Sequence, residues 1–318
     1  MNQYLTYMHL LTPLHTGGST NEGNLMGIAR EVHTEFPYLP ASSLRGKIRS
    51  TIESQDDLKE MAGAFFGQKI KDGQQPTEGE VWFADATLLF FPIASLSHHL
   101  VWITCPLWLD RWSRWLGKEG SKVQAVTQSC RENLSDDKKE KSAITSFKCD
   151  QLYLQTALLK QADIVTDIDF KPVLALLDTV LKDGGLLSQL KNRLIVLTDE
   201  DCIALVEIGL QREVRVALNQ DEKTVQGGSF RSEEAIPPEA VLFFPWGTKA
   251  ERSFQANSKM KPELVEEARE KHNNKLEKNA EVCSALNDVL KARLQFGGLE
   301  GLGRGWANLT TSKTGKEK

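Results

Sequence analysis

The sequence lacks the features that would assign it to several common classes of protein. It has only five cysteines in 318 residues, and no two of them have C-x-x-C spacing, so neither a zinc site nor a disulfide framework is indicated. No apolar run reaches the roughly 20 residues needed to span a bilayer, and the first residues show no basic segment ahead of an apolar one. We therefore expect a cytoplasmic protein with no membrane partner.

Motifs of the common nucleotide-binding and hydrolytic enzymes are also missing. The sequence contains no Walker motif, no G-x-G-x-x-G dinucleotide fingerprint and no G-x-S-x-G nucleophile elbow. None of the six histidines stands in H-E-x-x-H or another metal-ligand spacing. The pattern identifies no catalytic residue, so the catalytic residues stay unknown, and no metal or cofactor is expected.

The composition is that of an ordinary globular chain, with 40% hydrophobic and 26% charged residues, and the length suits one large domain with insertions. A net charge of -4 argues against attraction of nucleic acid to the whole surface. The charge is unevenly placed, however, because residues 36–52 contain Arg45, Lys47 and Arg49 and no acid. Any anion site is therefore expected to be local.

Hydrophobic periodicity predicts a mixture of strands and helices. Strands are predicted at residues 4–11, 80–91, 100–105, 194–197, 204–210 and 306–309, and helices at 42–53, 174–190 and 262–294. Residues 211–244 read as two extended arms around a Gly-Gly pair, and 131–150 as a charged loop. Trp108, Trp112 and Trp115 recur at helical spacing, which predicts core packing rather than a stacking platform.

Two segments are suited to binding phosphate. Residues 295–306 read QFGGLEGLGRGW, with five glycines in nine residues, and glycine amides can approach an anion closely. Residues 42–49 form the start of a helix that Ser42 or Ser43 can cap, with Lys47 and Arg49 able to neutralise phosphates. Alone, each segment is equally an ordinary turn or a solvated helix face; together they favour phosphate binding.

Several motifs, in order, resemble the RAMP superfamily of CRISPR effector proteins. They are His15-Thr-Gly-Gly18 in a glycine-rich loop, FPYLPASSLRGKIR at 36–49, and the glycine run. In the second motif, Ala41 replaces the usual glycine. The stretches DATLLFFP at 85–92, VWITCP at 101–106 and EEAIPPE at 233–239 are most similar to the backbone subunit of the type III-B (Cmr) complex.

The resemblance implies an α+β fold, a modified RRM-like (ferredoxin-like) palm with an inserted thumb hairpin and helical insertions. It implies a single RAMP domain over residues 1–318. The palm would comprise about 1–106 and 245–318, the helical, charged insertion about 107–200, and the thumb about 211–244.

The resemblance also implies a function in antiviral defence within a ribonucleoprotein. The expected partners are CRISPR guide RNA, complementary target RNA, copies of the chain stacked in a filament, and other subunits of the effector complex. The residues expected to line the RNA path are His15, Gly17, Gly18, Ser42, Ser43, Arg45, Lys47, Arg49, Gly298, Gly301, Gly303, Arg304 and Gly305.

One departure from the family pattern concerns cleavage. Members usually cut target RNA with an aspartate in the early loop, which here reads GNLMGIARE at 23–31. Counting from His15 places the aspartate at Met26, and counting back from Arg30 places it at Leu25; neither side chain can act as a base or hold a metal. We therefore expect target cleavage to be lost or weak, and a divalent metal to be needed only if cleavage is retained.

Two alternatives remain at this point. The first is a CRISPR RNA-processing endoribonuclease of the same superfamily, with His15 as general base and the glycine run holding an RNA hairpin. The second is an unrelated nucleotide-binding enzyme, which the missing phosphate-loop and cofactor motifs disfavour.

Overall fold

The computed structural model describes residues 3–18, 21–22, 25–68, 77–134, 141–181, 184–217, 230–249 and 262–314. Within these residues, eleven strands form one large sheet, ordered β11-β8-β12-β7-β6-β15-β1-β17-β16, with β4 beside β6 and β5 beside β15. The strands are β1 (Gln3–Leu10), β4 (Tyr38–Leu39), β5 (Val81–Phe83), β6 (Ala86–Ser95), β7 (His99–Thr104), β8 (Ala143–Thr145), β11 (Ile164–Val165), β12 (Leu194–Leu197), β15 (Val241–Thr248), β16 (Arg293–Gln295) and β17 (Trp306–Lys313).

The centre of the sheet is antiparallel. β1 lies between β15 and β17, and β15 lies between β1 and β6. Helix α1 (Ala41–Glu53) separates β1 from β6 in the chain, and helix α8 (Pro262–Val289) separates β15 from β17. The two ends of the chain thus supply neighbouring strands, β1 and β17, close to the β16 edge of the sheet, which brings sequence-distant loops together at the strand ends.

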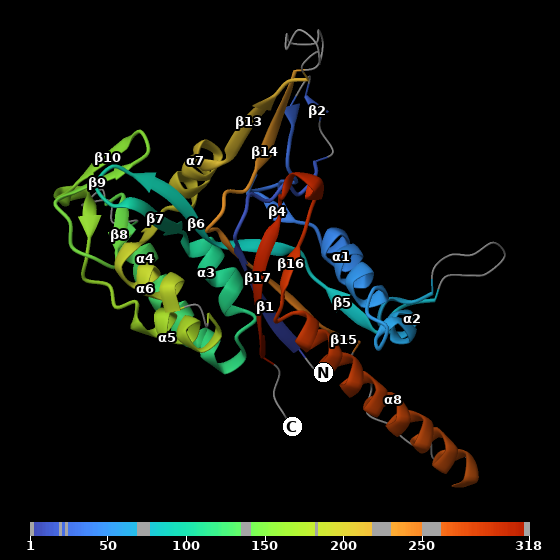
Figure 1. Ribbon diagram of the computed structural model, residues 1–318. Coiled ribbons are helices and arrows are strands. Elements are labelled where there is room, and N and C mark those ends of the chain that lie inside the picture. Colours follow the sequence, from blue (N-terminus) through green and yellow to red (C-terminus); the bar gives the residue numbers. More distant parts are fainter. Residues whose placement is uncertain are drawn as a thin grey trace.

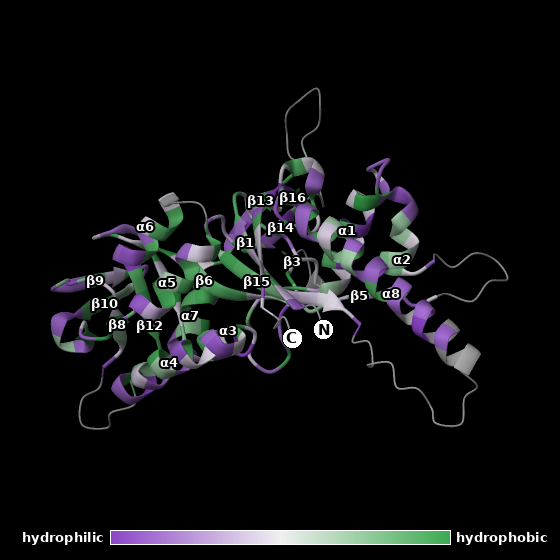
Figure 2. Ribbon diagram, turned by 90° about the horizontal axis from the view of Figure 1, so that it is seen from below, coloured by the Kyte–Doolittle hydropathy of each residue, from purple (hydrophilic) through white to green (hydrophobic). Residues whose placement is uncertain are grey.

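Helices cover both faces of the sheet (Figure 1). The remaining helices are α2 (Ala62–Phe66), α3 (Pro106–Ser113), α4 (Gly120–Leu134), α5 (Lys171–Val180), α6 (Gly184–Arg193) and α7 (Asp199–Gly209), with short 3-10 turns η1 (Lys59–Met61), η2 (Gly117–Glu119), η3 (Gln161–Asp163) and η4 (Glu300–Leu302). One hydrophobic core packs α1 and the packed end of α8 against the sheet. A second core packs residues of the four helices α3, α4, α5 and α6 against it. Figure 2 shows hydrophobic residues gathered in the central strands and hydrophilic residues along much of the projecting α8.

Two smaller sheets complete the described structure. β9 (Gln151–Leu154) and β10 (Ala157–Lys160) form a hairpin. The other sheet has the order β13-β14-β3-β2 and contains β13 (Gln211–Arg215), β14 (Arg231–Ala235), β3 (Leu25–Met26) and β2 (Asn21–Glu22). It rises away from the central sheet (Figure 1), and we call it the arm sheet.

The predicted mixture of helices and strands around a core is confirmed. In α1, the apolar side chains spaced four residues apart (Leu44, Ile48 and Ile52) are all fully buried, as the periodicity requires. Trp108 and Trp112 are also fully buried, which confirms core packing there. None of the described helices is both long and apolar enough to cross a bilayer.

Several predicted elements differ in the structure. The strand predicted at 204–210 is wrong, because these residues lie in α7 and just after it. Thr198 is the N-cap of this helix, and its Oγ1 accepts from Asp201 N–H. Three acidic residues in the first turn of α7 favour a helix by their interaction with its dipole. The helix predicted at 174–190 is two helices, and the one predicted at 262–294 ends at Val289. Residues 241–244, at the end of the range predicted for the thumb, belong to β15 in the central sheet.

Candidate nucleic-acid interface

Three segments that are far apart in the sequence meet at one end of the central sheet. Gly298 N–H donates to His15 O over 2.8 Å, which ties the glycine run to the early loop. Gly305 N–H donates to Pro13 O, also over 2.8 Å. Lys47 Nζ of α1 lies 3.4 Å from Glu300 Oε1 of η4. The two segments that the sequence suggested for phosphate binding, and the loop that begins at His15, are therefore neighbours.

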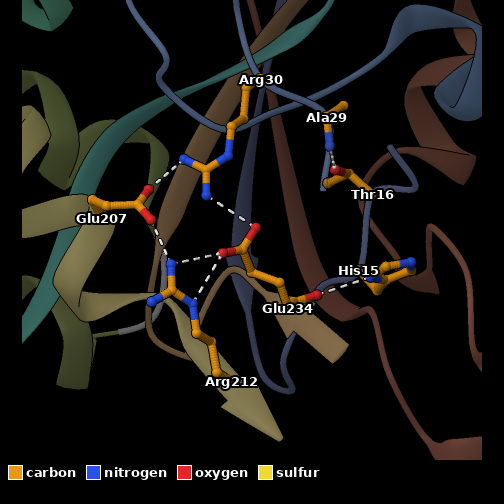
Figure 3. Close-up of polar contacts among 7 residues, drawn as sticks. All are labelled: His15, Thr16, Ala29, Arg30, Glu207, Arg212 and Glu234. Atoms are coloured by element: carbon orange, nitrogen blue, oxygen red, sulfur yellow. Dashed lines mark hydrogen bonds and ion pairs between the residues drawn. The ribbon is translucent and has the colours of Figure 1, made fainter. Parts of the chain in front are cut away.

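His15 anchors this junction through its ring. The side chain is buried, and Nδ1 lies 2.8 Å from Glu234 O, as Figure 3 shows. Because a carbonyl oxygen only accepts, Nδ1 carries a hydrogen. A Cβ added at Gly298 would come within 3.2 Å of the His15 ring, so glycine allows these two segments to pack together. His15 thus joins the early loop to β14 and to the glycine run.

The glycine run combines tightly packed glycines, among them Gly297 and Gly305, with an open surface. Gly305 has φ +79°, and a Cβ there would lie 1.8 Å from Phe296 O, so no other residue fits. Gly303 also has a positive φ, +74°, but it and Gly301 have open space around them and are exposed. Gln295 Nε2 holds the loop by donating to Glu300 O and Arg304 O. The result is a fixed loop whose exposed side has open glycines next to the side chains of Glu300 and Leu302.

The early loop adds a second surface of the same kind. Gly17 has φ +71° and nothing within 4 Å of its Cβ position, and it is exposed. Gly18 is also exposed but packs tightly, since a Cβ there would lie 2.8 Å from Gly27 O. Thr16 Oγ1 accepts from Ala29 N–H over 2.8 Å, which ties the beginning of the early loop to its end (Figure 3).

The basic residues of α1 divide into two groups. Arg45 donates to Val81 O and Phe66 O and lies over the Phe66 ring, and burial, together with the charge of Arg49, lowers its pKa. Arg49 pairs with Glu53 and donates to a backbone carbonyl. Both arginines therefore hold α1 to the protein, and Lys47 is the one of the three that reaches toward the glycine run.

The predicted capping of α1 by Ser42 or Ser43 is wrong. Pro40 occupies the N-cap position and no side chain caps from there. The Ala41 N–H instead donates to Asp85 Oδ1 over 2.7 Å. The carboxylate of Asp85, from the link between β5 and β6, thus already occupies the positive end of this helix, while Ser42 lies exposed beside it.

Arg304 lies in a cluster of charges between the glycine run and the arm sheet. It is buried, with Nη2 2.6 Å from Glu213 Oε2 and 3.9 Å from Glu233 Oε2. Arg215 Nε lies 2.8 Å from the same Glu233 oxygen. Two carboxylates therefore surround the guanidinium of Arg304, which joins the glycine run to β13 and β14 of the arm sheet.

A second cluster lies at the base of the arm around Glu234 (Figure 3). Glu234 is buried and pairs with Arg30 over 3.0 Å and with Arg212 over 3.2 Å, and Glu207 of α7 pairs with both arginines. Burial lowers the pKa of Arg30, but its attraction to Glu234 and Glu207 outweighs that effect and the net pKa is raised. The four side chains border a cavity of about 750 Å³ that Leu25 also lines.

Leu25 and Met26 form β3, one of the strands of the arm sheet. β3 runs parallel to β14, with Leu25 opposite Ser232 and Met26 opposite Glu233. Neither of the two positions where the family aspartate was expected carries a carboxylate. In the part of the chain that the structure describes, no group of three or more histidine, cysteine, aspartate or glutamate side chains is placed to hold a metal ion.

The charge clusters at the arm base are the functional feature that sequence reasoning missed. Arginines at 212 and 215 and glutamates at 233 and 234 are visible in the sequence, but their pairing depends on the strand register, in which Arg212 lies opposite Glu234 and Glu213 opposite Glu233. Adjacent glutamates on a strand point to opposite faces, which would have indicated two separate clusters.

Comparisons with known proteins place these features in a family. The family model of the RAMP superfamily matches residues 7–308. Over 249 residues, covering 76% of this chain and 80% of the relative, the chain is 27% identical to "CRISPR system Cmr endoribonuclease Cmr4" of Pyrococcus furiosus.

Two solved structures share the fold. Oligomeric Cmr4 from Pyrococcus furiosus superposes with a TM-score of 0.62 at 21% identity, covering 99% of this chain and all (100%) of that one. A chain of the type III-B Cmr-beta complex bound to cognate target RNA gives a TM-score of 0.65 at 20% identity, covering 97% and 96% of the two chains.

Proposed function

The chain belongs to the RAMP superfamily, as its sequence motifs predicted, and from this premise we propose that it is a guide-RNA-binding backbone subunit of a type III CRISPR effector complex. The expected resemblance to the type III-B (Cmr) backbone subunit is confirmed by the match to Cmr4. In the proposed assembly, copies stack along the guide RNA, contact complementary target RNA and join other subunits in antiviral defence.

The strand order supports an RRM-like palm. β17-β1-β15-β6 are neighbours in that order, all antiparallel, with α1 after β1 and α8 after β15, which is the split β-α-β arrangement of ferredoxin-like folds. We assign the palm to about 1–106 and 241–318, so that it includes all of β15, and the helical insertion to about 107–200. The thumb is assigned to about 211–240, of which 218–229 lie outside the described residues.

The observation that carries the proposal is the meeting of the early loop, α1 and the glycine run. The exposed glycines let a ligand approach the backbone closely, beside Lys47, whose ammonium pairs with Glu300 and supplies the positive charge there. Such a surface suits a sugar–phosphate backbone and needs no particular base sequence. We propose that the RNA follows this surface and that the arm sheet is the base of the thumb.

The contacts divide the proposed RNA-lining residues by role. Gly17, Gly18, Ser42, Gly301 and Gly303 are exposed and can touch the backbone of the RNA. Lys47 supplies a positive charge beside them. Six further residues support that surface: His15, Gly298 and Gly305 pack the loops together, while Arg45, Arg49 and Arg304 are held by protein groups. Ser43 lies half-buried between these two sets.

RNA binding as a function of salt tests the proposal. Each phosphate contact of a single strand adds about -0.7 to the slope of log K against log salt. The variant Lys47→Gln should reduce the slope by about that amount, because Lys47 faces the glycine run. Arg45→Gln is the control, since its guanidinium contacts Phe66 and Val81; it should lower thermal stability and leave the slope unchanged. Guide-RNA affinity that does not respond to salt would contradict the proposal.

We further propose that this subunit does not cut target RNA at the early loop, because Leu25 and Met26 offer no carboxylate. The assembled complex should leave bound target RNA intact, whereas Leu25→Asp or Met26→Asp should restore some cleavage when a divalent metal is supplied. Regularly spaced cuts by the unaltered complex that disappear with Glu22→Ala would show instead that another carboxylate serves.

The alternative function, processing of CRISPR RNA with His15 as the general base, has weaker support. His15 is only 5% exposed and its Nδ1 is bound to a backbone carbonyl, whereas a general base must reach its substrate. Cleavage of a repeat RNA by the isolated chain, lost with His15→Ala, would favour the alternative.

A further inference from the structure

Trp306 differs from the other tryptophans of the chain. Four of the seven (Trp102, Trp108, Trp112 and Trp246) are fully buried, and Trp82 and Trp115 lie close to each other, half-buried. Trp306 alone is exposed, at 38%, and among the described residues its ring has no aromatic neighbour and its indole N–H no acceptor. An exposed large aromatic side chain without partners is an informative exception to burial.

The position of Trp306 is fixed by the backbone around it. It is the first residue of β17 and directly follows the glycine run, opposite Gln295 of the edge strand β16. Its N–H donates to Thr12 Oγ1 and its carbonyl accepts from Leu11 N–H. The next residue, Ala307, is buried in the core below α1. Since side chains alternate along a strand, the indole lies on the opposite face of the sheet.

A positive charge lies near Trp306 on that face. Arg293 of β16 is exposed and donates through Nε to Asn308 Oδ1 over 3.1 Å. In the strand register, Arg293 lies opposite Asn308 and Gln295 lies opposite Trp306, so all four side chains are on one face of the sheet. Arg293 is two residues along the strand from Gln295, which places it about 7 Å from the Gln295–Trp306 pair. That separation is close to the advance of an extended single strand by one nucleotide. An aromatic ring and a cation therefore stand side by side on an exposed edge.

The chemistry of this edge matches an unpaired nucleotide. Single-stranded nucleic acids are held by aromatic rings that stack on bases and by a basic groove that follows the phosphates. The adjoining loop exposes Gly301 and Gly303, which have no side chain and open space around them, so a phosphate chain can approach the backbone closely there. RNA is therefore the occupant to which the ring, the charge and the open loop all point.

We propose that Trp306 and Arg293 form a stacking and phosphate site for one unpaired nucleotide of RNA bound along the glycine run. The inference rests on the proposed function and adds to it a site with a base-stacking component. Stacking depends little on salt, so this site should give the subunit RNA affinity that persists where phosphate contacts are screened.

The test measures affinity of the full chain for a labelled single-stranded guide RNA. Trp306→Ala should weaken binding about five- to 150-fold, the range expected from stacking of one base on an aromatic ring, without changing the salt slope. Trp306→Phe should restore most of it, and Arg293→Gln should reduce the salt slope by about 0.7. Leu158→Ala, at an exposed apolar residue of the separate β9–β10 hairpin, is the matched control and should bind like the unaltered chain.

A strand of ribose-phosphate without bases separates stacking from a structural effect. The unaltered chain and Trp306→Ala should bind that strand equally. Equal affinity of the two for guide RNA would overturn the inference, as would Trp306→Phe binding no better than Trp306→Ala. It would also be overturned if Trp306→Ala mainly reduced self-association without RNA, because the ring would then contact protein. No salt-dependent guide-RNA binding by the unaltered chain would instead refute the proposed function, and this site with it.

Discussion

Removing the charge of Glu234 should loosen the base of the arm sheet. The side chain is only 2% exposed, and its two oxygens accept from Arg30 and Arg212. Glu207 pairs with the same two arginines from α7, but its side chain is 44% exposed. The variants Glu234→Gln and Glu207→Gln therefore remove one carboxylate each from the same cluster at different depths.

The expected cost follows from burial. A hydrogen bond to a charged group contributes about 1.5–3 kcal/mol, and this applies to the bond with Arg30, whose side chain is 22% exposed. The bond with Arg212, 51% exposed, adds about 0.5 kcal/mol at most because of solvent screening. Glu234→Gln should therefore destabilise by about 2–3 kcal/mol, and Glu207→Gln by less than about 1 kcal/mol.

Thermal unfolding provides the assay. With an unfolding entropy of about 2.1 cal/mol/K per residue over 318 residues, Glu234→Gln should lower Tm by about 3–4 °C and Glu207→Gln by about 1 °C. Hydrogen exchange should localise the difference to β13 and β14. The reasoning is refuted if Glu207→Gln is as destabilising as Glu234→Gln, or if exchange in the arm sheet does not change.

Three further predictions concern packing, pH and thiol reactivity. Gly305→Ala should prevent stable folding, measured as loss of soluble chain, because its Cβ would overlap Phe296 O; Gly301→Ala, in open space, should be tolerated. Burial raises the pKa of Tyr4 from 10.0 to about 12, so stability is retained below pH 10 and falls as pH rises toward 12; Tyr4→Phe should flatten that decline in urea titrations. Iodoacetamide should label the half-buried Cys149 before the four buried cysteines, since burial hinders attack on a thiol; labelling of all five at the same rate in the native state would contradict this.

Local pattern was sufficient for elements whose packing is simple. The four-residue spacing of Leu44, Ile48 and Ile52 predicted α1, because one stripe of that helix meets one core. It failed at 204–210, where a short apolar run is compatible with either a strand or a helix. There the side chain of Thr198, several residues earlier, decides the outcome by capping α7.

The partners of the charged side chains could not be predicted, because they depend on strand register and loop contacts between distant segments. Arg45 and Arg304 are basic residues in motifs suited to phosphate, and the sequence treats them like Lys47. In the structure, Arg45 donates to backbone carbonyls and Arg304 pairs with Glu213. The contact between the glycine run and the early loop was not predicted, since no local pattern links residues so far apart in the sequence; the family resemblance implied only that both segments line the RNA path.

Glu233 and Glu234 suggest why the arm sheet needs charges on both of its faces. Being adjacent on β14, they point to opposite sides, and one pairs with Arg304 of the glycine run while the other pairs with Arg30 of the early loop. A strand fixed on one face alone could rotate about that contact. We expect ion pairs on both faces to resist such rotation, and both pairs end in the loops next to the proposed RNA surface. The same side chains thus connect the arm sheet to that surface.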